Sequence, residues 1–307
     1  MRAAPGGEVT TQKNAALILK GKPAADKVTE ELEATLAGLS AQVGRPPGLA
    51  VILVGENPAS EVYVRIKEKS ARRLGIETFD HRLPEETRRE DLLALVGRLN
   101  ADPAVHGILI QLPLPAHLPE EEVLRALDPA KDVDVFHPEN FGRLALKQGR
   151  LRPCTPAGVI EILKHYGIGI AGKRAVLIGR SKIVGLPLSL LLLHENATVT
   201  ICHSKTRDIA AHTRAADIVV TAMGVPGFLR ADMVREGAVV VDVGISRVGE
   251  KLVGDCDYEG LVGKVAAITP VPGGVGPMTV AMLMVNTVRA YGLQTLGEEA
   301  LRAGAPR

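Results

Sequence analysis

Residues 175–243 alternate four short apolar runs with polar or helical stretches, and this alternation constrains the fold more than any other feature of the chain. The runs span residues 175–179, 197–202, 217–223 and 238–243. Strands that alternate with helices pair in parallel, since each helix carries the chain back across the sheet. The pattern therefore predicts an α/β fold with a Rossmann-like parallel sheet and a ligand crevice at the carboxyl ends of its strands.

The turn between Gly179 and Gly185 leads from the first run into a helix that we expect over residues 183–194. Backbone N–H groups that are free at a helix N-terminus bind phosphate, so a nucleotide is the first ligand to consider. The three-glycine G-x-G-x-x-G pattern of dinucleotide sites is not matched, because only these two glycines are present. An ordinary strand-to-helix turn therefore stays open as the alternative.

The segment Cys202–Arg207, after the second run, indicates which dinucleotide the crevice prefers. NAD enzymes usually place an Asp or Glu here to bind the ribose hydroxyls, but this segment reads Cys-His-Ser-Lys-Thr-Arg. Hydroxyls and cations suit a ribose 2′-phosphate instead, and Arg180 in the glycine turn could add a bidentate contact. The sequence therefore favours NADP over NAD, with a solvated helix start as the alternative interpretation of Lys205 and Arg207.

Length and composition exclude several classes of protein. A chain of 307 residues, 46% of them hydrophobic, is long enough for about two domains with separate cores. A formal net charge of +2 and only 3% aromatic residues argue against nucleic acid as a partner. No apolar run approaches the roughly 20 residues of a membrane helix, and residues 1–14 lack a signal-peptide apolar region. We therefore expect a cytoplasmic protein with no membrane partner.

Three widely spaced cysteines without a C-x-x-C pair predict neither a disulfide framework nor a zinc site. We expect Cys154, Cys202 and Cys256 to be small buried side chains.

The first half repeats the alternation without a glycine-rich phosphate turn, which predicts a second α/β domain and a cleft between the two. The expected helices span residues 23–42, 60–74 and 87–100, and the expected strands span 49–54, 76–81 and 105–112. We place the approach to a linker at residues 141–153 and a final helix at 277–291. Residues 1–14 and 297–307 are expected to be frayed or disordered, because they bury too little to offset their ordering entropy.

Tyr63 and Lys67 are four residues apart on the helix expected from Ser60, so their side chains project from one face. A lysine desolvated in such a place can accept a proton near neutral pH, with the tyrosine ring as its platform or hydrogen-bond partner. An exposed Tyr-Lys surface pair is the alternative.

Gln111 ends an otherwise apolar strand, and an amide there must find hydrogen-bond partners or cost about 1–3 kcal/mol. Its neutral carbonyl oxygen could orient an amine without holding the positive charge as strongly as a carboxylate would. A glutamine that caps a neighbouring loop stays open as the other interpretation.

Two loops could complete a ligand site. Asp132 and Asp134 stand on the same side of what we expect to be an extended segment, and residues 269–279 form a loop rich in proline and glycine. Two carboxylates without a nearby histidine or acidic cluster are too few to hold a cation, so we expect no metal site. Hydrogen bonding to a ligand, or loop solvation, is the preferred role. The second loop would let backbone approach a flat ligand closely while losing little entropy.

Seven motifs in one order resemble the bifunctional methylenetetrahydrofolate dehydrogenase/methenyltetrahydrofolate cyclohydrolase family. They are Tyr63-x-x-x-Lys67, Val105-His-Gly-Ile-Leu-Ile-Gln-Leu-Pro113, Lys131-Asp-Val-Asp134, Pro153-Cys-Thr-Pro156, Gly179-Arg-Ser-Lys-Ile-Val-Gly185, Cys202-His-Ser-Lys-Thr206 and Thr269-Pro-Val-Pro-Gly-Gly-Val-Gly-Pro277. The resemblance spans residues 17–291. It implies a folate-binding catalytic domain over residues 1–147 that is completed by the C-terminal helix 277–307. It also implies an NADP-binding Rossmann-like domain over residues 148–276 and a homodimer.

The resemblance further implies NADP-dependent oxidation of 5,10-methylenetetrahydrofolate to 5,10-methenyltetrahydrofolate, then hydrolysis to 10-formyltetrahydrofolate, within one-carbon metabolism and purine biosynthesis. Cyclohydrolase chemistry then depends on Lys67, while Tyr63 stacks along the folate, Gln111 tunes the lysine and Asp134 anchors the pterin ring. The implied folate-binding set is Tyr63, Lys67, Gln111, Asp134, Pro272, Gly273 and Gly274. The implied NADP-binding set is Gly179, Arg180, Ser181, Ile183, Gly185, His203, Ser204, Thr206, Gly244 and Ile245, in which Arg180, Ser181 and Ser204 would meet the NADP phosphate.

Val135 departs from the family pattern, which usually has glycine after the second aspartate. If that glycine adopts a positive φ, a β-branched residue is strained there, and the pose of Asp134 changes with it.

Three other classes of protein share part of the pattern. A monofunctional dehydrogenase of the same family would lack Lys67 or its partners. A non-catalytic NADP-sensing protein would keep the two glycines of the turn but would have no need for Lys67 and Gln111. A short-chain dehydrogenase also uses Tyr-x-x-x-Lys, but its nucleotide turn comes near the N-terminus, whereas here Gly179 follows Lys67.

Overall fold

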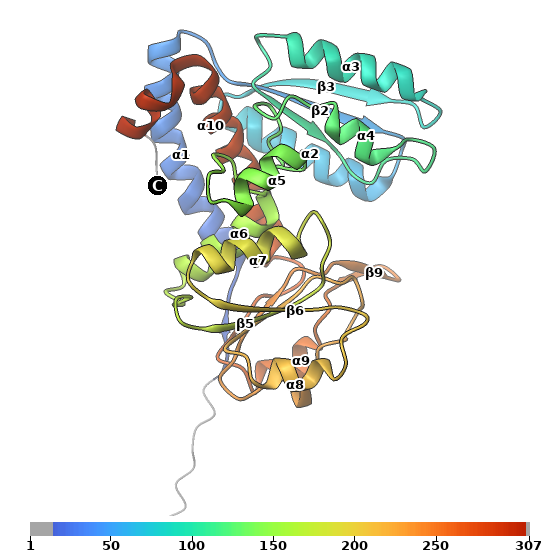
Figure 1. The fold of residues 1–307 in the computed structure, drawn as a ribbon, viewed down its shortest axis with the longest axis vertical. Helices are drawn as coiled ribbons and strands as arrows, with labels where there is room; N and C mark the ends of the chain where they lie inside the picture. The colour runs from blue at the N-terminus through green and yellow to red at the C-terminus, as the bar shows by residue number, and fades with distance from the viewer. Residues whose placement is uncertain (1–14, 305–307) are drawn as a thin grey trace, which may run out of the picture.

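A computed structural model of the protein describes residues 15–304, without the side chains of Ala59 and of residues 299–304. Two α/β units lie one above the other along the long axis of the molecule (Figure 1). Among the described helices, none has the length and the apolar content needed to cross a bilayer.

The first unit is built on a three-stranded parallel sheet in the order β3-β2-β4. Its strands are β2 (Gly48–Val54), β3 (Glu77–Leu83) and β4 (Gly107–Ile110). Every residue of β2 is buried, because successive side chains point into two different cores. Leu49 and Val51 pack into one core, whereas Ala50 and Ile52 pack into the other.

Helices supply the other side of each core. They are α1 (Gly21–Val43), α2 (Pro58–Arg73), α3 (Arg89–Ala101) and α4 (Glu120–Arg125). Residues of α1 and α2 belong to the core that contains Leu49, and residues of α3 and α4 belong to the core that contains Ala50. The sheet is therefore covered on both faces, as a parallel sheet requires.

The second unit is a six-stranded sheet in the order β1-β11-β8-β7-β5-β6, and all its neighbouring strands are parallel. The strands are β1 (Leu17–Ile18), β5 (Arg174–Ile178), β6 (Thr198–Cys202), β7 (Ile218–Thr221), β8 (Val239–Asp242) and β11 (Ala267–Ile268). This confirms the predicted Rossmann-like sheet. The chain order reverses at β5, which has β6 on one side and β7 on the other, and ligand crevices of such sheets lie at that reversal.

Shorter elements surround this sheet. Helices α7 (Gly185–His194), α8 (Ile209–Arg214) and α9 (Tyr258–Val262) connect its strands, with one turn of 3-10 helix, η1 (Ala231–Met233). An antiparallel hairpin of β9 (Ser246–Val248) and β10 (Lys251–Val253) follows β8.

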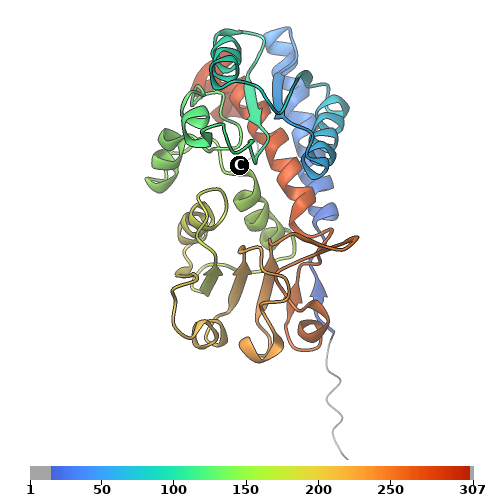
Figure 2. The same ribbon diagram turned by 90° about the vertical axis from the view of Figure 1, so that its right-hand side faces the viewer.

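Two helices link the units. They are α6 (Cys154–His165) and α10 (Val275–Gly304), which pack against each other, while α10 also packs against α1. A Cβ atom on Gly158 of α6 would lie 2.9 Å from the Met278 Cβ, so this close approach requires glycine. Figure 2 shows α10 running from the edge of the second sheet up into the first unit. The core that contains Leu49 therefore extends through these two helices into the second unit, whereas each unit also has a core without them, around Ile52 in the first and around Ile178 in the second.

The expected helices and strands are confirmed within a few residues, apart from the end of the final helix, whereas the expectation that the C-terminal segment frays from residue 297 is wrong. The expected linker approach at 141–153 begins inside α5 (Pro138–Ala145), where Leu144 is buried and the His137 side chain accepts from the backbone N–H of Glu139. The C-terminal segment, expected to fray from residue 297, is helical through Gly304 beyond a non-helical residue at Gly297. An ion pair between Arg150 and Glu298 ties it to the fold. Residues 1–14 and 305–307 lie outside the described part of the chain.

Candidate active site

Lys67 and Gln111 are brought together by α2 and the end of β4. The Lys67 side chain is buried, and its Nζ donates to the Gln111 Oε1 at 3.1 Å. The Gln111 Nε2 donates to the backbone oxygen of Leu112 at 2.7 Å, which turns the amide oxygen toward the amine. Gln111 thus lies next to the lysine rather than capping a loop elsewhere. A buried amine that faces a neutral acceptor is suited to proton transfer.

Tyr63 lies one helical turn before Lys67 on α2 and is half-buried. Burial raises the pKa of its phenol, so the ring stays neutral and can donate a hydrogen bond. Val62 and Ile66 on the same helix expose large apolar surfaces, 48% and 46% of their maximum. Helix α2 therefore presents a half-buried aromatic ring one turn from the buried amine and exposed apolar side chains on the adjacent stripe.

The segment with Asp132 and Asp134 is a turn, not the extended segment that we expected. Asp132 is buried, and its carboxylate accepts from the backbone N–H groups of Phe136 at 3.1 Å and His137 at 2.8 Å, and from Asn140 Nδ2 at 2.9 Å. Burial raises the pKa of the Asp132 carboxyl, against the opposing effect of these bonds. Asp132 therefore holds the turn together, which leaves Asp134, partly exposed, as the carboxylate that could meet a ligand.

Val135 has a φ of 64° and is buried, which confirms that this position has the positive φ at which a β-branched side chain is strained. The residue directly after Asp134 therefore has a strained backbone conformation.

At Val135, glycine is expected to give a more stable protein than alanine by about 1 kcal/mol. Both changes remove the same buried isopropyl group, so their difference reports the backbone. A glycine variant is usually less stable than an alanine variant by roughly 0.5–1 kcal/mol, because glycine loses more backbone entropy on folding. At a φ of 64°, however, steric strain from a Cβ atom lowers the stability of the folded protein by about 1–2 kcal/mol. Urea unfolding of the two variants measures the difference, and a more stable alanine variant would contradict the strain.

Cys154 joins this region, although its sequence context indicated only a small buried side chain. Its thiol donates to the backbone oxygen of Val133 at 3.3 Å. Burial raises the pKa of the Cys154 thiol well above its usual range, the charge and hydrogen bond of Asp134 add to this, and the charge of Lys67 opposes it. The thiol thus stays protonated, and its bond to the Val133 oxygen joins the start of α6 to the turn that carries Asp134.

The loop of Pro272, Gly273 and Gly274 lies where β11 passes into α10. Gly273 has a φ of 99°, and its carbonyl accepts from the backbone N–H of Gly21 at 2.8 Å. A Cβ on Gly274 would lie 2.5 Å from the Pro270 carbonyl oxygen. The glycines are therefore required by the tight path of the loop, whatever it binds.

The turn from β5 into α7 needs both of its glycines. Gly179 has a φ of 126°, and a Cβ there would lie 2.2 Å from the carbonyl oxygen of Ala222, which follows β7. A Cβ on Gly185 would lie 2.4 Å from the Gly179 carbonyl oxygen. The Ser181 Oγ accepts from the backbone N–H groups of Val184 and Gly185, both at 3.2 Å, and its own proton can still be donated. Helix α7 starts at Gly185, two residues later than predicted.

The turn after β6 is stabilised by two of its own side chains. Thr206 Oγ1 accepts from the His203 backbone N–H at 2.9 Å, and His203 Nδ1 accepts from the Lys205 backbone N–H at 3.2 Å. Ser204 and Lys205 are exposed at its tip. His203 and Thr206 therefore shape the turn, and Ser204 and Lys205 are the groups free to meet a phosphate.

Gly244 and Ile245 follow β8 at the same edge of the sheet. A Cβ on Gly244 would lie 2.1 Å from the Asp255 carboxylate carbon, while Ile245 is exposed. Asp255 was missed by the sequence reasoning. Its carboxylate accepts from the backbone N–H groups of Met223, Gly224 and Val225, at distances from 2.7 to 3.1 Å. It thereby fixes the loop after β7 against the segment that follows β10.

Together these turns form a cradle of backbone at the carboxyl ends of β5, β6, β7 and β8. These residues fit NADP for two reasons. The glycines exclude side chains where the backbone must approach a dinucleotide. After β6, hydroxyl groups and a lysine occupy the position at which NAD enzymes carry a carboxylate. Arg180 is exposed at the same turn.

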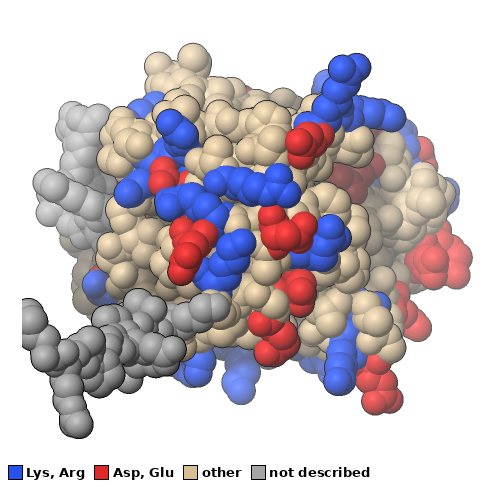
Figure 3. Space-filling model, turned by 90° about the horizontal axis from the view of Figure 1, so that it is seen from below, with Lys and Arg blue, Asp and Glu red and all other residues tan. Residues whose placement is uncertain are grey.

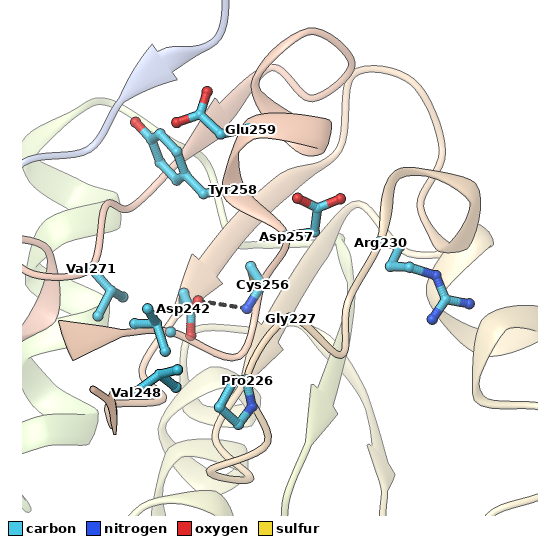
Figure 4. Close-up of a pocket in the computed structure, with 12 residues that line it drawn as sticks. Pro226, Gly227, Arg230, Asp242, Val248, Cys256, Asp257, Tyr258, Glu259 and Val271 are labelled. Carbon is cyan, nitrogen blue, oxygen red and sulfur yellow. Dashed lines mark hydrogen bonds between the residues drawn. The ribbon is translucent and has the colours of Figure 1, made fainter. Parts of the chain in front are cut away.

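A separate cavity of about 530 Å³ lies beside β8 and contains none of the predicted site residues. Figure 4 shows its lining, with the Asp242 carboxylate bonded to the backbone N–H of Cys256. Asp242 also accepts from the backbone N–H groups of Gly244 and Asp255, so its oxygens are already satisfied. Among the side chains that the structure describes, no group of three or more His, Cys, Asp or Glu is arranged to hold a metal ion.

Comparison with protein-family models places both halves of the chain in one family. Residues 19–134 match the catalytic domain of tetrahydrofolate dehydrogenase/cyclohydrolase, and residues 153–295 match its NAD(P)-binding domain. The chain is 54% identical to the bifunctional protein FolD of Desulfovibrio desulfuricans over 283 residues, which cover 91% of this chain and 99% of that protein.

Solved structures agree in fold. The bifunctional FolD methylenetetrahydrofolate dehydrogenase/cyclohydrolase of Campylobacter jejuni has a TM-score of 0.87 at 49% identity, covering 90% of this chain and 98% of that one. The Trypanosoma brucei enzyme, complexed with NADP cofactor and inhibitor, has a TM-score of 0.86 at 42% identity, covering 90% and 97%. This chain belongs to the tetrahydrofolate dehydrogenase/cyclohydrolase family.

Proposed function

We propose that the protein oxidises 5,10-methylenetetrahydrofolate with NADP and then hydrolyses 5,10-methenyltetrahydrofolate to 10-formyltetrahydrofolate, with Lys67 at the site of hydrolysis. The observation that carries the proposal is the bond between the buried Lys67 amine and the Gln111 amide oxygen. Neither a monofunctional dehydrogenase nor an NADP-sensing protein needs this pair, so it favours the bifunctional enzyme.

In the hydrolysis, water adds to the methenyl carbon and loses a proton. The tetrahedral adduct then collapses: its hydroxyl gives up its proton as the C=O bond of the formyl group forms, the bond from the bridging carbon to N5 breaks, and N5 takes up a proton, so that one proton is released overall. Lys67 moves these protons, and Gln111 holds the amine through a neutral oxygen that does not lock it in the charged form. Tyr63 stacks along the folate and Asp134 bonds the pterin ring, while Pro272, Gly273 and Gly274 contribute backbone to the folate site.

In the oxidation, NADP supplies the acceptor for a hydride from the methylene carbon. The chain's part is to hold the dinucleotide. Gly179, Gly185 and Gly244 allow backbone approach, Ser181 caps α7 beside the phosphates, and Arg180 and Ser204 bind the 2′-phosphate. His203 and Thr206 keep the turn of Ser204 in shape, and Ile183 and Ile245 offer exposed apolar contacts.

A two-step spectrophotometric assay tests the proposal. NADPH formation from methylenetetrahydrofolate reports the dehydrogenase, and decay of methenyltetrahydrofolate absorbance reports the cyclohydrolase. NADPH formation without faster methenyl decay would indicate a monofunctional dehydrogenase, and the absence of both would indicate a non-catalytic protein.

Gln111→Glu is expected to shift the cyclohydrolase pH profile to higher pH, although it adds no bulk. The new carboxylate would lie about 3.1 Å from the Lys67 amine and would stabilise its protonated form, so the neutral amine would appear only at higher pH. The pH dependence of methenyltetrahydrofolate decay measures the shift. An unchanged profile would show that the amide does not tune the lysine.

Arg180→Ala is expected to weaken NADP binding roughly ten- to hundredfold, through loss of a charge-assisted contact of about 1.5–3 kcal/mol. NAD, which lacks the 2′-phosphate, should be hardly affected. The measurement is the ratio of kcat/KM for the two cofactors in wild type and variant. Equal losses with both cofactors, or a wild type that prefers NAD, would contradict the assignment.

Further parts of the assignment stay predictions. They are the division into residues 1–147 with helix 277–307 and residues 148–276, the cleft between them, the homodimer, the cytoplasmic location, a role in purine biosynthesis and the absence of a nucleic-acid partner. Packing of α10 on α1 supports counting the last helix with the folate domain, although α10 also packs on α6, which falls in the range 148–276. Strand β1 falls in the range 1–147 but lies in the second sheet. On the face drawn in Figure 3, positive and negative side chains are interspersed, which does not favour binding to a polyanion.

A further inference from the structure

Asn286 is a buried polar residue in the middle of α10, only 1% exposed. Its Nδ2 donates to the backbone oxygens of Val133 and Arg152, both at 2.7 Å, and its Oδ1 accepts from the backbone N–H of Arg152 at 3.3 Å. The side chain thereby uses three of its four hydrogen-bonding positions. It joins the last helix to two segments that precede it by more than 100 residues.

One of these bonds ends on the peptide group directly before Asp134. The Val133 carbonyl accepts from Asn286 and also from the Cys154 thiol at 3.3 Å. On the other side of Asp134, the Asp132 carboxylate holds the backbone N–H groups of Phe136 and His137. The short turn is thus fixed at both ends.

Between these fixed ends lies Val135 with its φ of 64°. A β-branched residue persists in this conformation only when its surroundings outweigh the backbone strain. Since the bonds to Val133 come from α10 and α6, these helices supply part of that constraint. If they were removed, Val135 would be free to relax toward a negative φ, and the direction of the Asp134 side chain would change with it.

We infer that Asn286 is a positioning residue that holds Asp134 in its folate-binding pose through the Val133 carbonyl. This inference rests on the proposed function, because it takes Asp134 as a folate contact. Asn286 bonds only backbone groups and the Cys154 thiol among the described residues, so we expect it to affect folate binding through Asp134. Replacing Asn286 should then have no effect on folate binding in a variant whose residue 134 cannot bind the folate.

The test is Asn286→Leu, which keeps the branching and the number of heavy atoms and removes the amide donor from both carbonyl oxygens, so that the Val133 oxygen keeps only the Cys154 thiol. The KM for methylenetetrahydrofolate should rise at least about tenfold, since a misplacement of roughly 1 Å can cost a hundredfold. The Kd for NADP, which binds at the other unit, should not change. Thr287→Val is the matched control, because Thr287 is the next residue of α10, is fully buried and bonds only its own helix at the Leu283 oxygen, at 2.8 Å.

An Asp134→Asn background separates positioning from a general structural role. There, Asn286→Leu should change the folate KM less than about twofold, because a residue that acts through Asp134 has nothing left to position. Equal rises in both backgrounds would overturn the inference, and so would an unchanged KM in Asn286→Leu. An Asp134→Asn change that leaves KM unchanged would overturn it as well, whereas a wild type without either activity would show instead that the proposed function is wrong.

Should Asn286→Leu fail to bind NADP because it does not fold, Asn286→Ala decides the question. The smaller side chain leaves room for a water that bonds the two carbonyls, so the fold is kept while the fixed donor is lost. A rise in folate KM at unchanged NADP affinity supports the inference, and a wild-type KM overturns it.

Discussion

Replacing Lys67 with methionine is expected to lower the cyclohydrolase rate by at least about a thousandfold while NADP still binds. Methionine keeps an unbranched apolar stem in the buried site and removes only the amine. Gln111 Oε1 loses its partner, but no charge is left buried in its place. Without the amine, the tetrahedral adduct has no group to move its protons.

Methenyltetrahydrofolate decay measures the loss, and NADP affinity with far-ultraviolet circular dichroism checks the fold. Lys69→Met is the matched control, because Lys69 stands on the same helix two residues later and is exposed. It should keep near wild-type decay. If a folded Lys67→Met protein still hydrolysed the methenyl compound at a near-normal rate, Lys67 would not be the residue on which the hydrolysis depends.

The contact between Lys67 and Gln111 could be anticipated because two local rules place the partners. Helical spacing puts Tyr63 and Lys67 on one face, and the carboxyl ends of parallel strands gather at one sheet edge, where Gln111 stands. The identity of the partner was not contained in either rule. It comes from the packing of α2 on β2 together with the pairing of β2 with β4, which brings together residues 44 positions apart.

The roles of Asn286, Cys154 and Asp132 could not be predicted from the sequence. In the sequence, α10 is a nearly continuous apolar helix, and nothing local shows that Asn286 meets a carbonyl 153 residues earlier. Cys154 fits the pattern of a small core residue, and Asp132 has the same spacing signal as Asp134. Only the turn, which buries one carboxylate against backbone N–H groups and leaves the other partly exposed, separates their functions.

Short elements were missed for a related reason. Strands β1 and β11 have two residues each, so they cannot display the alternation that identifies a strand. Helix α4 has six residues and shows barely more than one turn of periodicity. Strand β11 is placed by pairing with β8, strand β1 by pairing with β11, and helix α4 by the core around Leu92, and all three are properties of the assembled fold.

Gly185→Ala is expected to abolish the dehydrogenase and leave hydrolysis of supplied methenyltetrahydrofolate near wild type, the converse of Lys67→Met. The new Cβ would lie 2.4 Å from the Gly179 carbonyl oxygen and 2.8 Å from the Arg180 Cα, and both are backbone atoms that cannot rotate away. Ordinary contact needs about 3.4 Å or more, so the turn must open by about 1 Å. A displacement of that size in a binding turn can cost roughly a hundredfold, and here it falls on the N-terminus of α7, where backbone N–H groups would meet the phosphates. NADP affinity should fall by at least that factor.

Gly169→Ala is the matched control in the same unit, because a Cβ there meets open space and should leave NADP affinity unchanged. Equal losses of both activities would point to a folding defect, and unchanged NADP affinity in Gly185→Ala would show that the turn from β5 into α7 does not hold the cofactor.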